Sequence, residues 1–167
     1  MRHREILTIE PDDVVGLIHE AVAARGEEWA YPDTSQCRYV YYRNDYQWAV
    51  DEAEYTGAKP DAAKMIEYFG DDNGAPACLV GYVLNLINPG LLYLAVEGNH
   101  NEDSVAGWMG YESGKDFVAQ VGETEYVFPV DVIDLLQTAQ AVQDSGQTWG
   151  SAETRVVQRI EAARGEV

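Results

Sequence analysis

The feature that most constrains the fold is an apolar run in the middle of the chain, from Pro76 to Ile87. A helix over this run would be apolar around most of its circumference, through Leu79, Val80, Val83, Leu84, Leu86 and Ile87. Such a helix has to be buried by other elements, and Asn88-Pro89-Gly90 is a strong signal for its end. We therefore expect a central helix here, with the remaining elements packed around it.

Other segments also show apolar residues at helical spacing. Pro11 to Arg25 is bounded by a proline at its start and by Gly26 after its end, which are typical helix boundaries. Leu91 to Val96 predicts a shorter helical turn. Near the C-terminus, helices from Pro129 to about Gly146 and from Trp149 to Ala163 are expected to pair as a helical hairpin.

Extended structure is predicted at residues 37–42, because strand-favouring Tyr and Val residues alternate there. Residues 65–69 are the expected partner strand, and Glu125 to Phe128 is either a short strand or an extended lead-in. The fold class is then α+β, a mostly helical domain with a small antiparallel sheet. A chain of 167 residues fits one domain over residues 1–167, with residues 44–64 as a possible insertion.

Charge narrows the classes of partner. The 29 Asp and Glu residues against 11 Lys and Arg residues give a net charge of −18. This charge repels phosphate backbones, so direct nucleic-acid binding is not expected, while a basic protein partner is favoured. The densest acidic stretch lies between Cys78 and Phe128, where Lys115 is the one basic residue. A surface patch of one sign is expected to centre there.

The sequence contains no apolar stretch as long as a membrane span and no hydrophobic signal core after Met1, so a cytoplasmic protein without membrane attachment is expected. Cys37 and Cys78 are the two cysteines, and in a reducing compartment they favour free thiols over a bridge.

Two segments resemble small uncharacterised proteins of actinobacteria and their phages. Those proteins pair a Pro-Ser-Cys-hydrophobic-Val-Gly-His segment with a later Ala-Gln-x-x-Gln-Asp-x-Gly-x-x-Trp-Gly segment. The matching runs here are Pro76-Ala77-Cys78-Leu79-Val80-Gly81-Tyr82 and Ala139-Gln140-Ala141-Val142-Gln143-Asp144-Ser145-Gly146-Gln147-Thr148-Trp149-Gly150. Tyr82 stands where those proteins often have His. The resemblance implies a phage or prophage accessory protein of the bacterial cytoplasm and no particular activity.

Cys78 is the candidate nucleophile, because a thiol at the start of a helix lies at the positive end of the helix dipole. Catalysis also needs a base, for which His100 is the first candidate and His19 the second. The alternative interpretation is a small buried residue in the core. The sequence has no closely spaced pair of Cys or His residues, so a metal site is not predicted. It also has no glycine-rich phosphate loop, and no cofactor is expected.

Aromatic residues are concentrated between residues 29 and 55, and such residues dominate interaction hot spots. The candidate binding residues are Trp29, Tyr31, Tyr39, Tyr41, Tyr42, Tyr46 and Trp48, with Tyr55 close by. An aromatic-rich core is the alternative. The leading interpretation is a non-enzymatic acidic interaction module, in one form a nucleic-acid mimic, and the alternative is a thiol-dependent hydrolase or transferase that uses Cys78.

Overall fold

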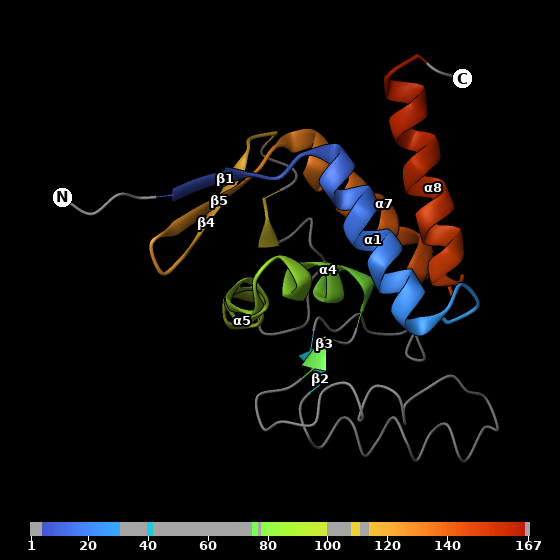
Figure 1. The fold of residues 1–167 in the computed structure, drawn as a ribbon, viewed down its shortest axis with the longest axis horizontal. Helices are drawn as coiled ribbons and strands as arrows, with labels where there is room; N and C mark the ends of the chain where they lie inside the picture. Colours follow the sequence, from blue (N-terminus) through green and yellow to red (C-terminus); the bar gives the residue numbers. More distant parts are fainter. Residues whose placement is uncertain are drawn as a thin grey trace.

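The computed structural model describes residues 5–30, 40–41, 75–76, 78–99, 108–110 and 114–165. Helices form one side of this arrangement, and a small sheet projects from them with the N-terminal strand (Figure 1). The α+β class, the predominance of helix and the C-terminal helical hairpin are confirmed.

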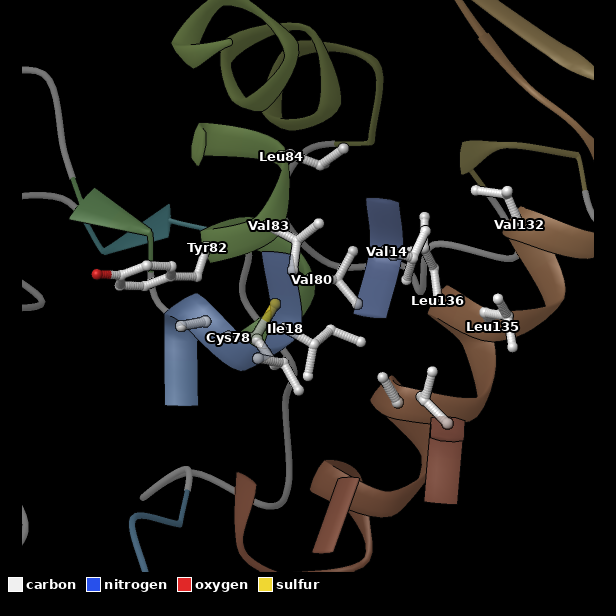
Figure 2. Close-up of a cluster of buried hydrophobic side chains, with 14 of the residues drawn as sticks. Val14, Ile18, Cys78, Val80, Tyr82, Val83, Leu84, Val132, Leu135 and Leu136 are labelled. Atoms are coloured by element: carbon white, nitrogen blue, oxygen red, sulfur yellow. The ribbon is translucent and has the colours of Figure 1, made fainter. Parts of the chain in front are cut away.

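The predicted central helix is α4, Leu79–Ile87, and it is the middle of the hydrophobic core. Every residue from Leu79 to Leu84 is buried. Figure 2 shows Val80 next to Val14 of α1, Pro11–Arg25, with Leu136 of α7, Val130–Asp144, on the other side of Val14. Burial of a Val or Leu side chain contributes roughly 1.5–3 kcal/mol, so this helix supplies much of the apolar burial that stabilises the fold.

Helices α1, α7 and α8, Trp149–Ala163, pack against one another beside α4 (Figure 1). Helices α1 and α8 have the bounds that the apolar spacing predicted. Thr148 caps α8 by accepting the Ser151 N–H at 3.1 Å, which satisfies a backbone donor that a helix start leaves open. The turn between α7 and α8 contains Gly146 at φ 86°, a conformation that glycine adopts without steric cost.

The larger sheet is three-stranded, in the order β1-β5-β4, with β1 at Glu5–Thr8, β4 at Phe117–Val121 and β5 at Thr124–Phe128. β4 and β5 form an antiparallel hairpin, and β1 runs parallel to β5. The strand expected at Glu125 to Phe128 is present as β5. β1 and β4 were not predicted, and the parallel pairing makes this sheet mixed rather than purely antiparallel.

A second, minor sheet pairs β2, Val40–Tyr41, antiparallel with β3, Ala75–Pro76. β2 falls inside the strand predicted at residues 37–42. The predicted partner at 65–69 and the possible insertion at 44–64 lie outside the described residues.

One face of the larger sheet is closed by the corner between α4 and α5, Pro89–Asn99. The Nδ2 group of Asn88 donates to the Tyr126 hydroxyl at 3.0 Å. A Cβ on Gly90 would lie 2.5 Å from Cγ1 of Val121, so the helix start touches the sheet directly. This contact fixes which face of the sheet is inner and leaves the opposite face on the outside.

Candidate functional site

Cys78 caps α4 from inside the core. Its side chain is 0% exposed, and its Sγ atom accepts the backbone N–H of Gly81 at 3.4 Å. Figure 2 shows the thiol close to Ile18 of α1, among apolar side chains. The sulfur accepts a backbone N–H that the start of the helix would otherwise leave without an acceptor, and it is not accessible to solvent. A substrate would therefore reach it only if the helices moved apart.

The two candidate bases differ in what the structure shows. His19 lies on the exposed side of α1, and its Nδ1 atom is 2.7 Å from Oε2 of Glu153 on α8. His100 lies outside the described residues. The Cys78 hypothesis therefore stays a prediction, with its nucleophile placed in the core.

Gln143 of α7 links the start of α4 to the start of α8. Its side chain is 0% exposed, and Oε1 accepts both the Leu79 N–H at 2.7 Å and the Trp149 Nε1–H at 3.0 Å. A buried amide that satisfies two buried donors holds the helices that carry them in one register. The Gln and Trp of the C-terminal segment thus serve the packing of α4 against the helical hairpin.

Trp29, the first candidate of the aromatic set, belongs to the core. It is 3% exposed, and its ring lies 4.4 Å from that of Trp149 in an edge-to-face arrangement. The guanidinium of Arg25, itself 6% exposed, lies 4.8 Å from the Trp29 ring, 4.9 Å from Trp149 and 5.1 Å from Tyr82. The rings face the cation and thereby stabilise a charge that burial would otherwise destabilise.

The rest of the aromatic set lies elsewhere. Tyr41 is in β2, and its backbone pairs with Ala75. The other candidates fall outside the described residues and stay predictions: Tyr31, Tyr39, Tyr42, Tyr46 and Trp48, with Tyr55.

Polar and charged side chains surround a groove of about 600 Å³ at the N-terminal end of α8. Glu27 and Glu28 line it from the turn after α1, and Glu153 and Arg155 line it from α8. Among these residues three carboxylates face one guanidinium, so the lining is acidic. In the parts of the chain that the structure places, no group of three or more His, Cys, Asp or Glu side chains has an arrangement suited to a metal ion.

The outward-facing side of the larger sheet is the surface that sequence reasoning missed. The register places six residues on it, and we call them the outer sheet face: Ile6, Thr8, Val118, Gln120, Glu125 and Val127. Side chains alternate between faces along a strand, and the opposite face carries Ala119, Tyr126 and Phe128, all buried. On the outer sheet face, Ile6 is 61% exposed and Val118 is 53% exposed.

Charge on the three strands has one sign. Glu5 and Glu125 are their charged residues, and the strands contain no Lys or Arg. The hairpin turn adds Glu123, whose carbonyl accepts the Glu5 N–H at 3.2 Å. The register places Glu125 on the outer sheet face with Ile6 and Val118, and places Glu5 on the opposite face. Val118, Glu123 and Glu125 fall within the stretch of sequence where a patch of one sign was expected.

Comparison with protein-family models, with curated proteins and with solved structures found no match to the chain. None of the helices in the described ranges is long and apolar enough to cross a membrane.

Proposed function

We propose that the protein is a non-enzymatic interaction module that binds a basic protein through the outer sheet face. The observation that carries the proposal is the exposure of Ile6 and Val118 on a sheet whose charged side chains are carboxylates. Large apolar side chains grouped on an otherwise polar surface are typical of protein contact sites.

The two kinds of residue on this face serve different parts of recognition. Burial of exposed apolar side chains contributes affinity. Carboxylates and a net charge of −18 accelerate encounter with a basic partner and disfavour acidic ones. The same charge argues against direct binding to nucleic acid and is compatible with a partner whose own ligand is nucleic acid, which is the mimicry form of the proposal.

The experiment compares immobilised variants for retention of proteins from a bacterial extract at low and high salt, followed by repeat measurements with the purified partner. The test variant is Ile6→Lys/Val118→Lys. Its control is Ala23→Lys/Ala24→Lys, which makes the same charge change on exposed positions of α1. A second control, Glu27→Lys/Glu28→Lys, reverses charge in the α8 groove.

We expect one basic protein to bind the native chain at low salt, to dissociate at roughly 0.5–1 M salt, where charges are screened within a few ångströms, and to be lost with the sheet variant alone. If the α1 control loses binding to the same extent, the effect is due to net charge. The assignment of binding to the outer sheet face is then overturned. Loss with Tyr39→Ala/Tyr41→Ala/Trp48→Ala alone would move the site to the aromatic segment.

A further inference from the structure

The free edge of β1 shows how a partner would attach. β1 is an edge strand, because the sheet order is β1-β5-β4 among the described strands. The N–H groups of Glu5 and Ile9 donate to carbonyls on the β5 side, of Glu123 at 3.2 Å and of Val127 at 2.9 Å. Backbone groups of alternate residues in a strand point to opposite sides, so those of Ile6 and Thr8 point away from β5.

The side chains of β1 leave this edge open on both faces. Ile6 is 61% exposed on the outer sheet face, and Leu7 is 41% exposed on the other face. Proteins usually protect sheet edges with Lys, Pro, a bulge or a covering element. The sequence of β1, Glu-Ile-Leu-Thr, contains none of these residues.

We propose that the β1 edge binds an extended segment of a basic protein, which adds to the sheet as a fourth strand. This inference rests on the proposed function and specifies its mode of binding and its partner. Main-chain hydrogen bonds to Ile6 and Thr8 supply affinity in strand addition, and side chains at alternate positions supply selectivity.

Charge complementarity selects the occupant. A Lys or Arg directly beside Glu5 forms an opposite-charge cross-strand pair, which contributes roughly 0.2–1 kcal/mol. The next residue of the added strand then lies beside Ile6 on the outer sheet face, where an apolar side chain such as Val covers the exposed Ile6.

A second copy of this chain is the less favoured occupant. Pairing of two β1 edges would bring together two molecules of net charge −18. Repulsion between like charges opposes that contact and favours a basic segment.

The test titrates the ¹⁵N-labelled full chain with three synthetic octapeptides: alternating Lys-Val, alternating Lys-Pro and alternating Glu-Val. Lys-Pro has the same charge as Lys-Val but lacks half of the backbone donors, and Glu-Val retains strand propensity with the opposite charge. We expect Lys-Val to bind at least about tenfold more tightly than either control, a difference of one factor of ten in Kd. Amide exchange should slow at Ile6 and Thr8 and remain unchanged at Leu7.

Two variants locate the binding. Ile6→Pro removes the outward N–H, and proline is tolerated on an edge whose N–H faces solvent. We expect this variant to lose Lys-Val binding. Glu5→Lys keeps all backbone N–H groups of the strand and replaces the proline variant as the test if that variant does not fold. We expect it to weaken Lys-Val binding about tenfold or more.

The outcomes separate the two proposals. The strand-addition proposal is overturned if Ile6→Pro still binds Lys-Val and if Lys-Val does not slow amide exchange at Ile6 and Thr8 of the native chain. The proposed interaction module is not affected by that result. No low-salt binding of Lys-Val overturns the edge proposal, and the interaction module is overturned only if the native chain also retains no basic protein from the extract. If exchange at Ile6 and Thr8 slows as the protein concentration rises and does not respond to peptide, the occupant of the edge is a second copy of the chain. That result overturns the proposal that a basic segment binds there.

Discussion

The backbone N–H of Gly150 donates to the carbonyl of Glu27 at 3.0 Å, and a Cβ added to Gly150 would lie 2.7 Å from that same oxygen. The start of α8 therefore meets the turn after α1 at a distance that only glycine permits. The neighbouring Trp149 N–H donates to the Trp29 carbonyl at 2.8 Å, so two consecutive hydrogen bonds join these segments.

This contact predicts that Gly150→Ala lowers the free energy of unfolding by about 1–3 kcal/mol, the usual range for overpacking in a tight site. The matched control is Gly16→Ala in α1, where an added Cβ would meet nothing within 4 Å. Alanine there should raise stability by about 0.5–1 kcal/mol, because glycine is a poor residue for a helix interior. Urea unfolding followed by circular dichroism measures both, and effects of the same sign would contradict the prediction.

Gln143→Leu should destabilise the fold by about 2–4 kcal/mol, since it leaves the Leu79 N–H and the Trp149 Nε1–H buried without their acceptor. Gln137→Leu is the control on the same helix. Within the described part of the chain, the buried Oε1 atom of Gln137 has no hydrogen-bond partner, so the same change there should cost little. Thermal unfolding distinguishes the two variants. Similar losses at both positions would refute a special role for Gln143.

Cys78 should react slowly with iodoacetamide in the native protein and rapidly in urea. A side chain at 0% exposure becomes accessible only through opening of the structure. In a Cys37→Ser background we expect at least about a hundredfold difference in rate, because opening of a helix core requires several kcal/mol. Mass spectrometry follows the alkylated fraction. Native reactivity equal to that of an exposed thiol would instead support the thiol-enzyme alternative.

The ion pair between Arg159 and Asp134 should contribute little to stability. Nη2 of Arg159 donates to Oδ1 of Asp134 at 3.0 Å, but the Arg159 side chain is 48% exposed and the pair is screened by water. A double-mutant cycle with Arg159→Ala and Asp134→Ala should give a coupling of about 0.2–1 kcal/mol that decreases with salt. A coupling above 2 kcal/mol would show that the link between α7 and α8 depends on charge rather than on apolar packing.

The helices were predictable because their signals are local. Apolar spacing and boundary residues gave α1 and α8 with their observed bounds. The central helix begins at Leu79 rather than Pro76, because Ala75–Pro76 pairs as β3 and Cys78 is the N-cap. Asn88-Pro89-Gly90 ends α4 as expected. It also starts α5, since proline fits a first helical turn and Oδ1 of Asn88 accepts the Gly90 N–H at 2.9 Å.

The sheet and its outer face were harder to predict because they depend on distant pairing. Four residues, Glu5–Thr8, contain too little alternation to distinguish a strand from a lead-in. Their exposure follows from the pairing of Ile6 with Glu125, and nothing near Ile6 in sequence specifies that register. The aromatic segment shows another limit of sequence reasoning. Composition shows that many aromatic residues occur there, but it does not show which of them are buried, and Trp29 lies in the core.

The parallel pairing of β1 with β5 also has a consequence for biosynthesis. β1 leaves the ribosome before α1 and α4, and its partner β5 follows much later in the chain. Closing so long a loop is slow compared with forming local helices. During translation, Ile6 and Leu7 therefore remain unpaired and exposed while α1 and α4 can already form. The sheet is complete only when the β4–β5 hairpin has emerged, so the proposed binding surface arises late and a truncated chain lacks it.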